Sequence, residues 1–195
     1  MEPDQPRPHT PLVVYRTQYG HAQSYAEWLA EDLGAMLVNL GDKPDPDLST
    51  ASVVILVCPI YARSYYGAKE FSLLVENHPD IPLVGASVGA SDPENPENIQ
   101  AYKALIKATF SEGIQSRMQW FHLRGGLDYP RMSHAHRAMM WMVSRAAKRK
   151  GAKGDAESQM MYETYGQVID FRDRSTIEPI VEYVRGLSSR PDPAP

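Results

Sequence analysis

The stretch ASVVILVC, residues Ala51–Cys58, constrains the fold more than any other part of the chain. It is apolar and rich in β-branched residues along its length. A strand that is buried on both faces of a parallel sheet has this composition. The stretch therefore predicts a central strand with other elements packed against both of its sides.

Apolar segments of strand length alternate with helical patterns along the rest of the chain. Further strands are expected at Leu12–Tyr15, Met36–Leu40, Ile81–Val88 and Met118–Leu123. Helices are expected over residues 21–33, 66–77, 99–111, 133–150 and 176–187. This alternation predicts an α/β fold, a doubly wound five-stranded parallel sheet with helices on both faces, in a domain spanning residues 11–187. The proline-rich tails, residues 1–10 and 188–195, are expected to be disordered.

Composition narrows the class of protein. The 195 residues suffice for one domain, and the formal net charge of −4 argues against general nucleic-acid binding. The single Cys58 excludes an internal disulfide framework and a cysteine zinc site. Residues 1–11 lack the apolar core of a signal peptide, and no apolar run is long enough to span a bilayer. We therefore expect a cytoplasmic protein, and peripheral attachment to the inner face of the membrane stays open.

In a doubly wound sheet, ligands bind beyond the carboxyl ends of the strands, so four loops become candidates: 16–21, 58–66, 87–98 and 124–132. The first is a polar turn before a helix, whose free N–H groups and partial positive charge favour a phosphate. Gly20 would allow close approach, Thr17 and Gln18 could donate hydrogen bonds, and Arg16 could add a positive charge. The alternative is a tight turn without a ligand. Neither a Walker loop nor a GxGxxG fingerprint is present.

The next two loops offer aromatic and small residues. The loop CPIYARSYY holds three tyrosines that could stack on a planar cofactor and Arg63, which could meet an anionic group. Alternatively, the tyrosines only cover the edge of the sheet. In SVGASDPENPEN, the small residues Ser87, Gly89 and Ser91 would let backbone amides approach a ring system, or the segment is an ordinary loop.

Four stretches make the chain resemble the flavodoxin-like family, and within it the menaquinone-dependent, oxygen-independent protoporphyrinogen oxidases. They are VVYRTQYGHAQSYAEWLA, VILVCPIYARSYYGAKEF, FHLRGGLDYPRMSHAHRAMMWMVSRAAKRKG and VIDFRDRSTIEPIVEYVRGL. The third stretch is the most specific, because ordinary flavodoxins lack its Gly-x-x-x-Tyr-Pro turn and long basic helix. The chain departs from the family's phosphate loop at Arg16 and Ala22, where the family has hydroxyl residues.

The resemblance implies FMN as the cofactor. The phosphate would lie on residues 17–22, and the ring between residues 58–64 and 87–91, with residues 125–129 close by. Loops and resemblance together predict these cofactor-binding residues: Arg16, Thr17, Gln18, Tyr19, Gly20, His21, Ala22, Pro59, Ile60, Tyr61, Ala62, Arg63, Ser87, Val88, Gly89, Ala90, Ser91, Gly126 and Tyr129.

The function that the resemblance implies is an FMN-dependent oxidoreductase. It would oxidise a small molecule such as protoporphyrinogen and pass electrons to a quinone or another carrier. Tyr61, Arg63 and Tyr129 would shape the ring site, and no side chain is assigned as an acid or base. Two alternatives stay open: a flavodoxin-type electron carrier, and a flavin-free binding domain whose phosphate loop has degenerated.

A basic segment lies between Tyr129 and Gly154, with seven lysines and arginines and no acidic residue. Its amphipathic helical pattern has three interpretations. It packs on the sheet with a solvated basic face, it contacts a membrane surface through residues 131–153, or its arginines capture an anionic substrate such as a porphyrin. His134 and His136 point to different faces of a helix, so the sequence does not predict a metal site there.

Overall fold

The computed structural model describes residues 10–42, 46–61 and 64–188. Most of the two tails predicted to be disordered therefore lies outside the described residues. At the boundaries of the described residues, Thr10 belongs to the first strand and Ser188 to the last helix.

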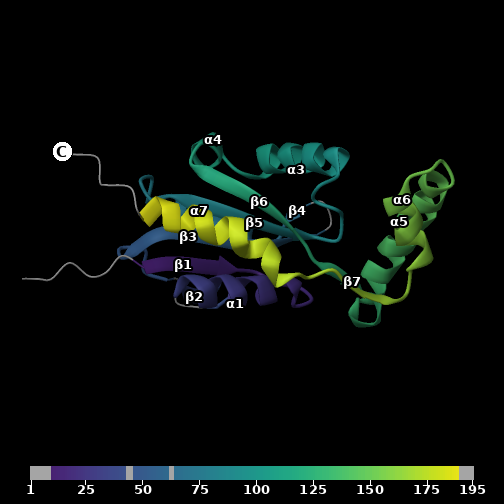
Figure 1. Cartoon of the computed structure of the whole chain (residues 1–195), viewed down its shortest axis with the longest axis horizontal. Helices are drawn as coiled ribbons and strands as arrows, with labels where there is room; N and C mark the ends of the chain where they lie inside the picture. The colour runs from purple at the N-terminus through teal and green to yellow at the C-terminus, as the bar shows by residue number, and fades with distance from the viewer. Residues whose placement is uncertain (1–9, 43–45, 62–63, 189–195) are drawn as a thin grey trace, which may run out of the picture.

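The central sheet confirms the predicted α/β fold. Its five parallel strands are β1 (Thr10–Tyr15), β2 (Met36–Asn39), β3 (Ala51–Tyr61), β5 (Leu83–Gly89) and β6 (Met118–Arg124). They lie in the order β2-β1-β3-β5-β6, so β2 is added on one side of β1 and the later strands on the other (Figure 1). The short β4 (Ser64–Tyr65) folds back antiparallel on the end of β3.

Alternate residues of β3 belong to two separate cores. Val53, Ile55 and Val57 pack with α1 (His21–Leu33) and α7 (Glu178–Ser188) on one face. Val54 and Leu56 pack on the other face, with α2 (Ala68–Val75) and α4 (Glu112–Gln115). The α3 helix (Pro96–Thr109) adds partly buried residues to that second core. The apolar composition of the central strand thus follows from burial on both faces.

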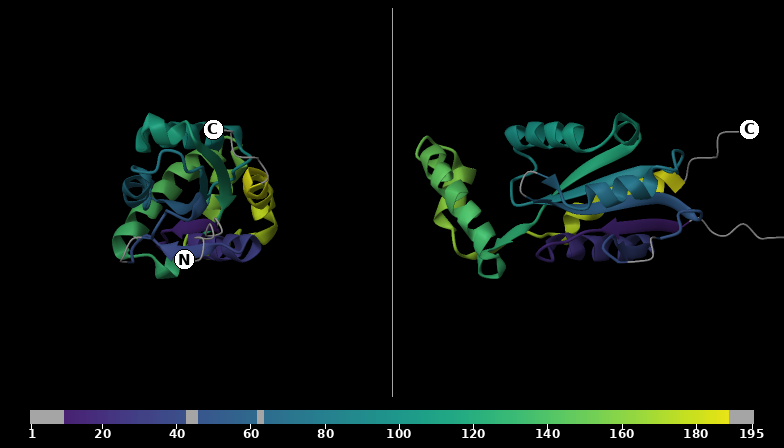
Figure 2. Two further views of the ribbon diagram at one scale, coloured as in Figure 1. Left: turned by 90° about the vertical axis from the view of Figure 1, so that its left-hand side faces the viewer. Right: turned by 180° about the vertical axis from the view of Figure 1, so that it is seen from behind.

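The segment after β6 does not cover the sheet. Here α5 (His134–Gly151) packs on α6 (Ala156–Glu163), and the helix pair projects beyond the carboxyl ends of the strands (Figures 1 and 2). A two-stranded ribbon of β7 (Gly126–Asp128) and β8 (Val168–Asp170) connects this pair to the body, and 3-10 turns follow at Tyr129–Arg131 and Arg174–Ile177.

The interpretation of α5 as a helix packed on the sheet is therefore wrong. Its buried residues Ser144, Ala147 and Gly151 are small and face α6. A Cβ on Gly151 would lie 2.9 Å from Cα of Gln159, so glycine permits the close helix approach. Within the described residues, no helix combines the length and apolarity needed to cross a membrane.

Candidate functional site

A pocket of about 140 Å³ lies at the carboxyl ends of β1, β3, β5 and β6, where the predicted ligand loops meet. The predicted residues that line it are Thr17, Gln18, Tyr19, His21, Ala22, Pro59, Ile60, Tyr61, Val88, Gly89, Ala90 and Gly126. Four loops that are far apart in the sequence thus line one pocket. Parallel strands cause this convergence, because their carboxyl ends share one edge of the sheet.

The turn before α1 presents a helix N-terminus to this pocket. Gly20 has φ of +94° and its N–H donates to the Thr17 hydroxyl oxygen over 2.9 Å, which closes the turn. Within the described residues, no side chain caps the first turn of α1, and that turn contains no acidic residue. Its backbone N–H groups can therefore bind an anion, and the helix dipole favours one there.

The prediction that Arg16 adds positive charge at the phosphate site is corrected, because Arg16 does not line the pocket. The Arg16 Nη2 atom lies 3.5 Å from Oε1 of Glu70, and its Cζ atom lies 5.1 Å from the centre of the Tyr66 ring. A Cβ on Gly67 would lie 2.5 Å from Arg16 Cγ, so the arginine stem packs tightly on that residue. The side chain turns toward α2 because its ion-pair partner is there.

Other predicted cofactor residues also lie elsewhere. Gly20 lines a neighbouring polar pocket of about 300 Å³. The Ser91 carbonyl accepts a hydrogen bond from the Tyr102 hydroxyl over 3.4 Å. Tyr129 is buried against Tyr165, with ring centres 4.9 Å apart. Ala62 and Arg63 lie outside the described residues.

Ser87 is also absent from the pocket lining, because it is buried in the core beside β6. Its Oγ atom lies 2.7 Å from Nδ1 of His122, and the His122 ring stacks on Tyr102 with centres 4.3 Å apart. Burial lowers the pKa of His122 to about 4. Ser87, which the sequence predicted to lie at the flavin ring, thus forms a buried polar pair with His122 instead.

Stability should fall as the pH drops from about 6.5 to about 4. The unfolded chain protonates His122 near its ordinary value of 6.5, whereas the folded protein keeps the side chain neutral down to about 4. In this window the unfolded state binds the additional proton, so acid favours unfolding. Thermal melting at pH 7 and pH 5 measures the effect, and the His122→Gln variant should show a smaller difference. An equal difference in both proteins would rule out this explanation.

Sequence reasoning missed the wall that α5 contributes. His136, Met139 and Met140 of α5 line the pocket, with Met132 from the turn before it. Gly125 and Leu127 also line it, within the segment 125–129 that was predicted to lie close to the ring. The Tyr19 hydroxyl oxygen lies 2.6 Å from Nδ1 of His136, and the Tyr61 ring centre lies 4.7 Å from the His136 ring centre. The methionine-rich pattern was the available signal, but periodicity alone cannot tell which partner a helix faces.

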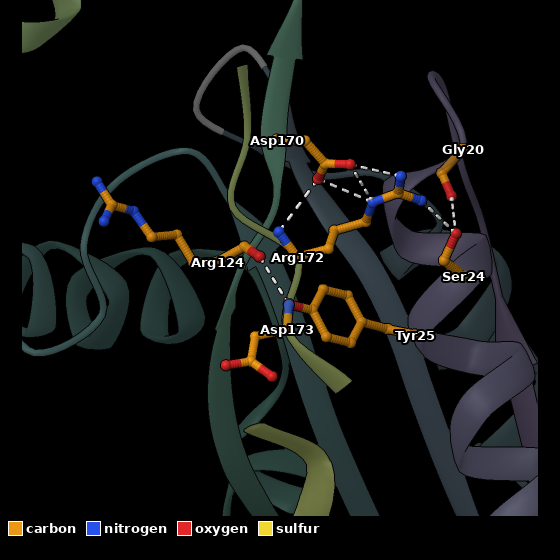
Figure 3. A network of polar contacts seen from close by, with 7 residues as sticks. All are labelled: Gly20, Ser24, Tyr25, Arg124, Asp170, Arg172 and Asp173. Carbon is orange, nitrogen blue, oxygen red and sulfur yellow. Dashed lines mark hydrogen bonds and ion pairs between the residues drawn. The ribbon is translucent and has the colours of Figure 1, made fainter. Parts of the chain in front are cut away.

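A polar network holds the first turn of α1 to the segment after β8 (Figure 3). Arg172 donates to both carboxylate oxygens of Asp170 and, over 2.6 Å, to the Ser24 hydroxyl. The Ser24 hydroxyl donates to the Gly20 carbonyl over 3.3 Å. Hydrogen bonds from Arg172 lower the pKa of Asp170. Burial, followed by the nearby Arg172 charge, lowers the pKa of His21, which favours its neutral form between the two pockets.

The carboxylate of Glu157 attaches α6 to the loop that follows β5. It accepts hydrogen bonds from the Asp92 N–H over 3.0 Å, from Asn98 Nδ2 over 2.9 Å and from Asn95 Nδ2 over 3.3 Å. Gly89 and Ala90, directly before this loop, line the pocket. Glu157 therefore couples the position of the helix pair to the pocket wall.

The Glu157→Ala variant should release the helix pair without unfolding the body. Hydrogen bonds to a charged group contribute roughly 1.5–3 kcal/mol each, so their loss is large for one loop, while the sheet retains both cores. Hydrogen exchange should accelerate in residues 91–98 and in α6. Glu163→Ala is the matched control, since this exposed carboxylate accepts a hydrogen bond from Gln159 of its own helix. Unchanged exchange in Glu157→Ala would contradict the coupling.

Comparison with known proteins gives the family of this fold. The model of the flavodoxin domain family matches residues 12–153. No curated protein matches. Similar solved structures include an archaeal flavodoxin, with 12% identity, TM-score 0.43 and coverage of 90% of this chain and 99% of the other. The azoreductase AzrA has 9% identity and a TM-score of 0.37, with coverage of 79% of this chain and 99% of the other. The Trp repressor binding protein of Bacillus subtilis has 14% identity and a TM-score of 0.38, with coverage of 60% of this chain and 85% of the other.

Proposed function

Because the chain belongs to the flavodoxin domain family, we propose that it is an FMN-binding oxidoreductase with its flavin in the pocket at the carboxyl ends of the strands. One observation carries the proposal: the pocket joins the uncapped N-terminus of α1 to an apolar chamber. FMN has the same two parts, an anionic phosphate and a largely apolar ring system.

The residues present fit such a group. Thr17 and the backbone N–H groups at the start of α1 would hold the phosphate. Pro59, Ile60 and Val88 supply apolar walls for the ring. Within the described residues, the buried Tyr61 hydroxyl has no hydrogen-bond partner, so it is available to a polar edge of the ring. Ala22 offers no hydroxyl, and we therefore expect the phosphate to depend mainly on backbone donors.

Bound FMN supplies hydride or single-electron transfer. The chain's own contribution is to bind, orient and exclude water. Met132, Met139 and Met140 would screen the chamber from solvent. His136 and Tyr19 share a hydrogen bond at the pocket wall and could hold a proton there, at Nδ1 or at the phenol oxygen.

For the substrate, we propose a reduced molecule with a large apolar framework, such as protoporphyrinogen, with a quinone as acceptor. The support is the methionine-lined wall, since flexible thioether side chains adapt to irregular apolar surfaces. A flavodoxin-type carrier would share the flavin site but would not oxidise such a substrate by itself.

An absorption spectrum of the purified protein, before and after titration with FMN, tests the proposal. Flavin bands that persist through gel filtration are expected. Oxidation of protoporphyrinogen by the loaded protein, with a quinone present, then separates the enzyme from a carrier. A protein that remains colourless and ignores added FMN would refute the flavin site.

A further inference from the structure

The α5 helix presents an exposed outward face, which we define as Trp141, Met142, Arg145 and Arg149. Two of these residues, Trp141 and Met142, are large and apolar and yet are 49% and 60% exposed. Figures 1 and 2 show the helix pair at one end of the molecule, clear of the sheet and its covering helices. A flat surface could therefore reach this face without meeting the body.

The segment that carries this outward face is strongly basic. Between Tyr129 and Gly154 there are seven lysines and arginines and no acidic residue, on a chain with a formal net charge of −4. The remainder of the chain is therefore acidic. The Arg145 Cζ atom lies 5.1 Å from the centre of the Trp141 ring, so a cation and an aromatic ring lie together on the outward face.

We propose that the outward face of α5 docks on an anionic lipid surface. Arg145 and Arg149 would meet lipid phosphates, while Trp141 and Met142 would enter the interfacial layer, where aromatic rings and snorkelling cations are favoured. The acidic remainder of the chain would be repelled and would point away. A nucleic acid would satisfy the cations but leave the exposed Met142 without a partner.

This docking has a consequence for the pocket. The opposite side of the same helix carries His136, Met139 and Met140, which line the pocket wall. A docked α5 would therefore place the pocket one helix diameter from the lipid, within reach of apolar molecules dissolved there. The inference does not depend on the flavin, because it concerns only the outward side of the helix.

Co-sedimentation of the full chain with vesicles tests the proposal. The protein should bind vesicles that contain about one-third phosphatidylglycerol, not pure phosphatidylcholine, and added salt should release it. The double variant R145E/R149E should bind at least roughly thirtyfold more weakly, because each basic residue near the surface contributes about a fivefold factor. The matched control K103E/K107E reverses two exposed lysines on α3 and should bind like the wild type.

The apolar contribution has its own measurement. Trp141 fluorescence should shift to shorter wavelength with anionic vesicles, and the Trp141→Phe variant should lose this shift. Circular dichroism confirms that each variant is folded. Equal binding to neutral vesicles, equal loss in the control variant, or unchanged binding of R145E/R149E would overturn the proposal. Tighter binding to a duplex oligonucleotide than to vesicles would assign the face to nucleic acid and overturn it as well.

Discussion

Replacing Gly126 with alanine should weaken FMN binding by between about tenfold and a hundredfold. A Cβ at this position would collide with the Ile169 carbonyl oxygen and lie 2.8 Å from Nε2 of His21. The first contact is with backbone of β8, which pairs with β7 and cannot move freely. Overpacking of this kind typically costs about 1–3 kcal/mol. Since His21 begins α1 and lines the pocket, its displacement disturbs the proposed phosphate site directly.

The matched control is Gly113→Ala in α4, where a Cβ would have no heavy atom within 4 Å among the described residues. Alanine also has the better helix propensity, so this variant should be neutral or slightly stabilising. Fluorescence titration with FMN and thermal melting measure both variants. Wild-type affinity in Gly126→Ala would show that the β7–β8 ribbon yields and that its position does not determine flavin binding.

The sequence predicted the body of the fold because local patterns determine it. The helix at residues 21–33 has the predicted bounds, since its apolar residues recur every three or four positions up to the stop at Gly34. The central strand was recognisable because both of its faces are buried. Convergence of the loops then followed from the parallel sheet, and this placed residues such as Thr17, Pro59 and Gly89 at one pocket.

The remaining parts depended on contacts that no local pattern encodes. Tyr19 and His136 are 117 positions apart in the sequence, and only the path of the β7–β8 ribbon brings them together. Met139 and Met142 are one turn apart on α5, yet the first lines the pocket and the second is exposed to solvent. The Arg16 side chain pairs with Glu70 on α2, a contact that no pattern near Arg16 indicates.

The Tyr25→Ala variant should lose about 4 kcal/mol or more of unfolding free energy. Tyr25 is fully buried on α1, and removal of a buried aromatic side chain costs about 3–5 kcal/mol. Its hydroxyl donates to the Arg124 carbonyl over 2.8 Å and accepts from the Asp173 N–H over 3.1 Å (Figure 3). Both backbone groups would lose this partner, which adds roughly 1–3 kcal/mol for a buried group left unpaired.

Tyr25→Phe separates these two contributions, because it keeps the ring and removes only the hydroxyl. Its expected cost is roughly 1–3 kcal/mol by urea denaturation, with Tyr183→Phe on the exposed side of α7 as the control. Arg124 directly precedes Gly125 and Gly126 of the pocket, so the loss of its anchor should also weaken FMN binding in Tyr25→Phe. Full stability in Tyr25→Phe would mean that water replaces the hydroxyl. Reduced stability with unchanged FMN affinity would mean that the pocket wall is positioned by the β7–β8 ribbon alone.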